Sequence, residues 1–177
     1  PKLMSLAAVN SPSSATLAGY MPSIERLANE LTIEGIFNRK LDVEIPYHSP
    51  LMDRIMPRLA KALKDVRTSV PHTPLYSTVT GEIVKTASFG AEYWPKNVRQ
   101  PVEFEAAINA ILEDGFTTFV EIGPHPVLSA SLRDCIKVAG KECRLIHTLR
   151  RNLPDESLTV HRAAMSVFAT GNEVNWD

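Results

Sequence analysis

From residue 50 onward, segments with helical periodicity alternate with short apolar runs, and this alternation limits the folds open to the chain. The clearest helical segment follows Ser49 and Pro50, which suit the N-cap and first position of a helix. Apolar residues then recur at every fourth position from Leu51 to Leu63, so we expect a helix to about Asp65. Further helices are expected near residues 101–113, 127–138 and 157–169, and short strands near 75–79, 116–122 and 144–148. The order predicts an α/β layer with a partly parallel sheet.

The first 46 residues carry a different pattern. Short apolar runs at residues 3–9 and 15–18 precede a helix that we expect to begin at Ser23 and to end at Gly35. In residues 36–46 apolar side chains alternate with Asp42 and Glu44, which predicts a strand. The order β-β-α-β resembles a small ferredoxin-like layer over about residues 3–46.

Composition excludes several classes of function. The chain has 177 residues, 44% of them hydrophobic and 22% charged, as in an ordinary globular protein. A formal net charge of −1 gives no sign of a nucleic-acid surface, and no apolar run approaches the length of a membrane span. The start of the chain has no signal peptide and no initiator methionine, so we expect a cytoplasmic piece of a longer protein. Cys135 and Cys143 are expected to be reduced thiols.

His48 is the main candidate for catalysis, because it lies between a predicted strand and an amphipathic helix. Side chains at strand ends often face substrate in α/β sheets, and an imidazole can serve as a general base near neutral pH. The alternative is a histidine that only caps or packs under the next helix. The pattern alone leaves both readings open.

Two further motifs allow a functional and a structural reading. His125, in a stiff turn between two prolines, could line a pocket or could be a turn residue satisfied by backbone carbonyls. Asn97 follows Tyr93 and Trp94 in a predicted loop whose backbone could orient an imidazole or could merely lead into the next helix. The remaining histidines have no acidic or cysteine partners at ligand spacing, so no metal site is predicted. No serine has the Gly-x-Ser-x-Gly spacing of a nucleophile elbow.

Four ordered motifs carry a family resemblance. They are Ala7-Ala8-Val9-Asn10-Ser11-Pro12, Tyr47-His48-Ser49-Pro50, Tyr93-Trp94 with Asn97-Val98-Arg99-Gln100-Pro101-Val102, and Glu121-Ile122-Gly123-Pro124-His125-Pro126-Val127-Leu128. In this order they resemble the C-terminal half of the acyltransferase domain of type I modular polyketide synthases, which are related to malonyl-CoA:acyl carrier protein transacylases. The closing Gly171-Asn172-Glu173-Val174-Asn175-Trp176 is similar to the linker after such domains.

The resemblance implies a fold and a domain organisation. Residues 3–46 would form the ferredoxin-like small subdomain, residues 47–150 the C-terminal part of the hydrolase-like large subdomain, and residues 151–177 the linker that follows the acyltransferase.

The resemblance also implies a mechanism. A serine takes a malonyl-type group from coenzyme A as an acyl-enzyme and passes it to the phosphopantetheine thiol of an acyl carrier protein, with no bound cofactor. His48 would be the general base and acid, held by the backbone carbonyl at Asn97 in a Ser–His dyad. Asn10, Tyr47 and, more weakly, His125 would line the substrate pocket.

The family's serine elbow lies upstream of the residues matched here, so we expect the chain to need that N-terminal half and to be inactive alone. Its partners would be the carrier protein and neighbouring synthase domains. The bulky Tyr47 favours malonyl over methylmalonyl, although Ile45-Pro46-Tyr47-His48 matches neither familiar four-residue signature. Two other functions stay open: a non-catalytic acyltransferase-like module that docks neighbouring domains, and a malonyl transacylase of fatty-acid synthesis.

Overall fold

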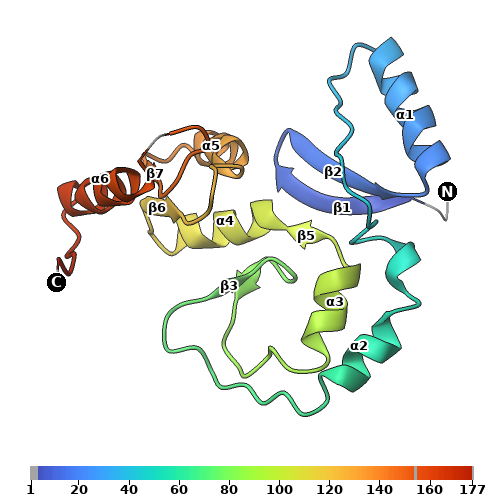
Figure 1. Cartoon of the computed structure of the whole chain (residues 1–177), viewed down its shortest axis with the longest axis horizontal. Helices are drawn as coiled ribbons and strands as arrows, with labels where there is room; N and C mark the ends of the chain where they lie inside the picture. Colours follow the sequence, from blue (N-terminus) through green and yellow to red (C-terminus); the bar gives the residue numbers. More distant parts are fainter. Residues whose placement is uncertain (1–3, 154, 177) are drawn as a thin grey trace. The chain divides into compact units, whose positions relative to one another are not determined.

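The protein consists of two compact units, Pro1–Ala107 and Ile108–Asp177 (Figure 1). The structure is a computed structural model that describes residues 4–153 and 155–176. The division falls inside helix α4 (Phe104–Glu113), and the subdomain boundaries expected at residues 46 and 150 stay predictions.

A three-stranded sheet organises the first unit. Strand β1 (Met4–Ser11) pairs antiparallel with β2 (Ser14–Gly19), and β5 (Val102–Glu103) pairs parallel with the other edge of β1. Helix α1 (Met21–Ile33) follows β2. It begins two residues before the predicted Ser23 cap, because Pro22 suits the first turn of a helix. It ends at Ile33, two residues before Gly35, whose φ of +73° allows the main chain to turn away. The predicted β-β-α order is confirmed.

The strand predicted over residues 36–46 is wrong. The amide groups of Val43 and Tyr47 bond to carbonyls only two residues back, at 3.1 and 2.9 Å, and no residue of this segment joins a sheet. Its apolar side chains are exposed, Val43 by 64%. Alternation marks the two faces that a strand would have, but a strand forms only where a neighbouring backbone takes up its hydrogen bonds.

The helix predicted from residue 50 to Asp65 is broken. A 3₁₀ turn, η1 (Pro50–Met52), is followed by a short helix, α2 (Met56–Ala62). Pro57 explains the break, because a proline in the interior of a helix removes a hydrogen bond and its ring clashes with the preceding turn. At the start of α2 the same residue is tolerated.

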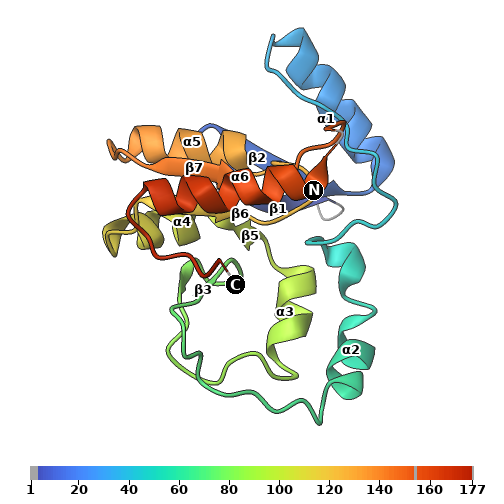
Figure 2. The ribbon, with the colours of Figure 1, turned by 60° about the vertical axis from the view of Figure 1, so that its left-hand side comes forward.

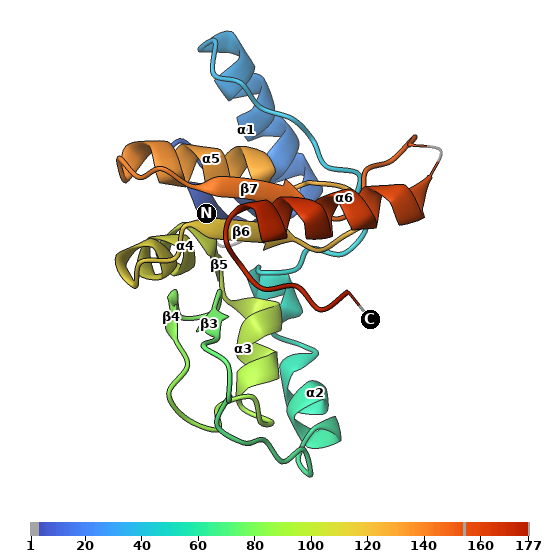
Figure 3. The ribbon, with the colours of Figure 1, turned by 90° about the vertical axis from the view of Figure 1, so that its left-hand side faces the viewer.

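Residues 93–99 form helix α3 (Tyr93–Arg99), although a loop was predicted there. Figure 3 shows α3 beside the hairpin of β3 (Tyr76–Ser77) and β4 (Glu82–Ile83). The hydroxyl groups of Tyr93 and Ser77 are 2.9 Å apart, and the Tyr93 ring meets those of Phe89 and Trp94 at centroid distances of 4.4 and 5.2 Å. These contacts anchor α3.

The second unit is a β-α-β arrangement followed by one more helix. Strands β6 (Thr118–Glu121) and β7 (Arg144–His147) pair in parallel, and helix α5 (Ser129–Val138) connects them. Helix α6 (Glu156–Ala169) lies against β7 (Figure 2) and falls within the expected linker region. The unit buries mainly aliphatic side chains and one thiol, at Ile108, Leu112, Leu132, Cys135, Ile136 and Ala163. The predicted partly parallel α/β layer is confirmed. Within residues 4–153 and 155–176, no helix combines the length and apolar character needed to cross a bilayer.

Candidate active site

His48 adopts a left-handed backbone conformation, with φ at 61°. Side-chain-bearing residues rarely adopt this conformation, which costs on the order of 1 kcal/mol or more and persists only where surrounding contacts enforce it. In the described part of the chain, Asn152 is the only other non-glycine residue with a positive φ. Specific contacts must therefore hold His48 in this conformation.

Two hydrogen bonds hold the main chain on either side of His48. Its amide group donates to the carbonyl of Val98, at the end of α3, at 2.9 Å. Its carbonyl accepts from the hydroxyl of Ser5, on β1, at 2.9 Å. The two peptide groups that flank the His48 Cα are thus tied to different elements.

A third contact fixes the imidazole ring. His48 Nδ1 lies 2.7 Å from the backbone carbonyl oxygen of Gln100. A carbonyl can only accept, so Nδ1 carries the proton in this hydrogen bond, and in the neutral ring the lone pair is on Nε2. Among the described residues Nε2 has no hydrogen-bond partner, and the residue is half-buried. The arrangement leaves Nε2 as an open acceptor nitrogen, which is what a general base requires.

The carbonyl that orients His48 belongs to Gln100, so the prediction of Asn97 is wrong by three residues. Asn97 lies inside α3, whereas Gln100 follows the helix with an extended conformation, φ −81° and ψ 158°. The following Pro101 excludes the helical conformation at Gln100 by steric contact. The chain therefore leaves the helix at this residue, and its carbonyl is available to the imidazole.

Ser49 and an ion pair stabilise the segment that follows the histidine. Ser49 is fully buried; its hydroxyl donates to the carbonyl of Pro46 at 2.7 Å and accepts from the amide of Leu51 at 3.3 Å, which confirms the predicted cap. Arg99 forms an ion pair through Nε with Asp53, directly after η1. The 98–100 segment therefore contacts His48 through Val98 and Gln100, and it contacts Asp53, after His48 in the sequence, through Arg99.

Tyr47 and Asn10, the other candidates in the first unit, have different surroundings. Tyr47 is 46% exposed, and its ring lies 6.3 Å from the imidazole, centroid to centroid. The Asn10 amide donates to the hydroxyl of Thr16 across the β1–β2 hairpin at 2.9 Å, five residues along β1 from Ser5. Tyr47 is thus next to the candidate base, and for both residues substrate contact stays a prediction.

His125 lies in the second unit. Its Nδ1 accepts from the backbone amide of Arg151, 26 residues along the chain, at 3.4 Å. This partner differs from the backbone carbonyls that the structural reading expected. The preceding Glu121 caps α5 with its two carboxylate oxygens, which accept from the amide of Leu128 and the hydroxyl of Ser129 at 2.9 Å each. A role of His125 in substrate binding stays a prediction.

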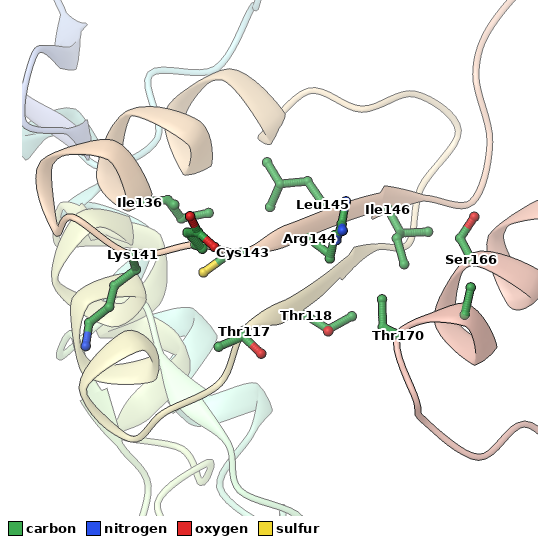
Figure 4. A pocket seen from close by; sticks show the side chains of 12 residues that line it. Thr117, Thr118, Ile136, Lys141, Cys143, Arg144, Leu145, Ile146, Ser166 and Thr170 are labelled. Atoms are coloured by element: carbon green, nitrogen blue, oxygen red, sulfur yellow. The ribbon is translucent and has the colours of Figure 1, made fainter.

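A hollow of about 1060 Å³ lies over β6 and β7 in the second unit (Figure 4). Residues of both strands, α5 and α6 line it, among them Cys143, whose pKa is raised because burial disfavours the thiolate. None of the predicted site residues lies there. Across the described residues, no group of three or more histidine, cysteine or acidic side chains could hold a metal ion.

Sequence reasoning missed Ser5, Val98 and the Gln100 carbonyl. The Gln100-Pro101 dipeptide carried a usable signal, since a residue before proline is biased toward an extended conformation. Ser5 gave no signal, because it meets His48 across 43 positions of sequence.

Comparison with known proteins places this site in a family. Residues 1–174 match the family model "Acyl transferase domain". The chain is 38% identical over 148 residues to Erythronolide synthase EryA2 of Saccharopolyspora erythraea, and 37% identical over 177 residues to Polyketide synthase GfsB of Streptomyces halstedii. These alignments cover 84% and 98% of the chain, but only 4% and 3% of the two synthases.

The fold agrees with that of solved acyltransferases. The acyltransferase domain from module 8 of the salinomycin polyketide synthase superposes with a TM-score of 0.93 at 30% identity; the match covers 99% of this chain and 41% of that one. A malonyl-CoA:acyl carrier protein transacylase from Xanthomonas oryzae, at 22% identity and a TM-score of 0.73, shares the fold. The chain therefore belongs to the acyl transferase domain family, as part of an acyltransferase domain of the type I polyketide synthase kind.

Proposed function

We propose that this chain is part of an acyltransferase that moves a malonyl-type extender unit from coenzyme A to the phosphopantetheine thiol of an acyl carrier protein. His48 would be its general base and acid. The observation that carries the proposal is the 2.7 Å contact between His48 Nδ1 and the Gln100 carbonyl, which leaves Nε2 as the proton acceptor.

The proposed reaction has two halves. Nε2 of His48 takes the proton of a serine hydroxyl as the serine oxygen attacks the thioester carbonyl. The tetrahedral intermediate then collapses, and the departing coenzyme A thiolate takes that proton from the imidazolium. The same two transfers, with the phosphopantetheine thiol as nucleophile, release the acyl group to the carrier protein. The serine would come from outside these 177 residues, since none of their serines lies in a Gly-x-Ser-x-Gly elbow.

A backbone carbonyl can replace the aspartate of a Ser-His-Asp triad in this scheme. The aspartate of a triad keeps the imidazole in one tautomer and orientation, and it stabilises the imidazolium. The Gln100 carbonyl performs the first two tasks with a fixed dipole, and Pro101 holds that dipole in place. The carbonyl also accepts a hydrogen bond from the imidazolium once Nε2 has taken the proton.

A transfer assay tests the proposed function. The full protein that carries this chain is incubated with radiolabelled malonyl-CoA and holo acyl carrier protein, and label on the carrier protein is followed over time. We expect label on the carrier protein and on the acyl-enzyme in a ping-pong pattern. If the protein binds the carrier protein but transfers no label to it, either from malonyl-CoA or in a parallel assay with radiolabelled methylmalonyl-CoA, the domain is a non-catalytic docking module.

Tyr47 provides the test of extender choice. Its ring lies beside the imidazole, so we propose that it restricts the space for the α-methyl group of methylmalonyl. With equal concentrations of the two thioesters, wild type should load malonyl in preference, and Tyr47→Ala should shift the ratio toward methylmalonyl by about 10-fold or more, the usual worth of one methyl group. Tyr20→Ala, which removes an exposed tyrosine at the N-cap of α1, is the matched control. A wild-type preference for methylmalonyl would contradict the assignment.

A further inference from the structure

Both peptide groups flanking His48 have long-range partners. The amide on the N-terminal side is held by Val98, which restricts rotation about φ. The carbonyl on the C-terminal side is held by Ser5, which restricts rotation about ψ. Together they set the direction of the Cα–Cβ bond, and therefore the point from which the imidazole reaches Gln100.

Ser5 contacts His48 from a different part of the chain than Val98 and Gln100 do. Val98 and Gln100 belong to one short segment, so a displacement of that segment would move both contacts together. Ser5 lies on β1, where it pairs with Ala18 in the register with β2. A hydroxyl on a paired strand is a donor with little freedom, which suits the task of holding a backbone conformation that L-residues disfavour.

We propose that Ser5 is a positioning residue for the reaction of His48. The inference rests on the proposed function, because it assigns Ser5 a part in catalysis through the imidazole. Without the hydroxyl, the His48 carbonyl loses its donor and rotation about ψ is less restricted, so only the amide contact to Val98 still holds the left-handed backbone conformation. The Nδ1 contact to Gln100 would then be populated for a smaller fraction of the time, and Nε2 would be misplaced for the rest.

Three substitutions test this in the full protein that carries the chain. Ser5→Ala removes the donor, Ser5→Thr keeps a hydroxyl in a residue that suits a strand, and Ser14→Ala removes an exposed hydroxyl from the neighbouring strand β2 as the control. The measured quantity is the single-turnover rate of acyl-enzyme formation from malonyl-CoA. We expect Ser5→Ala to lower this rate roughly 3- to 10-fold, the usual effect of one lost hydrogen bond, with little change in KM. Ser5→Thr should restore most of the rate, and Ser14→Ala should leave it unchanged.

Two further measurements separate positioning from a general effect on the fold. In a His48→Ala background, Ser5→Ala should cause no additional loss, because the imidazole through which it acts is gone. With [¹⁵N]histidine-labelled protein, Ser5→Ala should shift the ring nitrogen signals of His48 and leave those of His161 in place. An unchanged rate in Ser5→Ala, an equal loss in both backgrounds, or unchanged His48 signals would overturn the inference.

The outcomes also keep this inference apart from the proposed function. If His48→Ala retains full activity, the proposed function fails, and so does the catalytic part assigned to Ser5. If His48→Ala is inactive while Ser5→Ala matches wild type in rate and spectrum, the proposed function stands and only the role of Ser5 is rejected.

Discussion

At the scale of single residues, the site depends on backbone conformation as much as on side-chain chemistry. His48 presents Nε2 because its own main chain is left-handed and because Gln100, before a proline, turns a carbonyl toward Nδ1. The sequence identified His48 as the candidate base, but it placed the carbonyl that orients the imidazole at Asn97, three residues before Gln100. The identity of that carbonyl depends on where α3 ends, which local pattern did not reveal.

Gly81 and Gly35 offer a matched test of backbone and packing effects. Both have a φ of +73°, but a Cβ at Gly81 would lie 2.6 Å from the Cβ of Ala106, whereas a Cβ at Gly35 would meet nothing within 4 Å. We expect Gly35→Ala to lower the free energy of unfolding by about 1 kcal/mol, the strain of a left-handed residue. Gly81→Ala should cost about 2–4 kcal/mol, because overpacking adds to that strain.

Urea unfolding of the two variants measures this difference. Equal losses for Gly35→Ala and Gly81→Ala would show that the β3–β4 turn does not pack against the start of α4 as described.

At the scale of elements, the sequence predicted what is local and missed what is not. The helices near 101–113, 127–138 and 157–169 were found, because amphipathic periodicity is a property of each segment by itself. The strand expected at 36–46 did not form, because pairing requires a second backbone that the segment does not determine. Helix α3 was taken for a loop, since its stability comes from aromatic contacts to Phe89 and a hydrogen bond to Ser77.

The Asp53–Arg99 ion pair connects η1 to the end of α3, and we expect it to support the catalytic geometry more than overall stability. Both partners are partly exposed, by 60% and 29% of their side chains, so the pair should stabilise the fold by no more than about 1 kcal/mol. It nevertheless holds the segment that carries both carbonyl partners of His48. Asp53→Ala and Arg99→Ala should each lower the rate of malonyl transfer about 2- to 5-fold, and the double variant should be no slower than either single one.

The exposed pair Lys40–Glu25 is the control for this experiment, because it lies on α1 and the segment after it and has no contact with the 98–100 segment among the described ion pairs. Loss of that pair should leave the rate unchanged. Additive losses from Asp53→Ala and Arg99→Ala would contradict a coupled role.

At the scale of the whole molecule, the family assignment and the local chemistry agree. The chain folds as part of an acyltransferase domain and spans 41% of the salinomycin module 8 domain. His48, the 98–100 segment and Ser5 all belong to the first unit, so the proposed base and its supports are assembled within one compact body. The motifs that identified the family could be read directly from the sequence. The three contacts that hold His48, made by Val98, Gln100 and Ser5, could be found only in the tertiary structure.

His161 allows a direct test of the central claim that His48 is the general base. Its Nδ1 also lies 2.7 Å from a backbone carbonyl, that of Ser157, but it stands exposed on α6. The measurement is the single-turnover rate of acyl-enzyme formation from malonyl-CoA in the full protein, compared between His48→Ala, His161→Ala and wild type. We predict a loss of about 10²- to 10⁴-fold for His48→Ala and no change for His161→Ala. A His48→Ala variant that acylates at the wild-type rate would contradict the account.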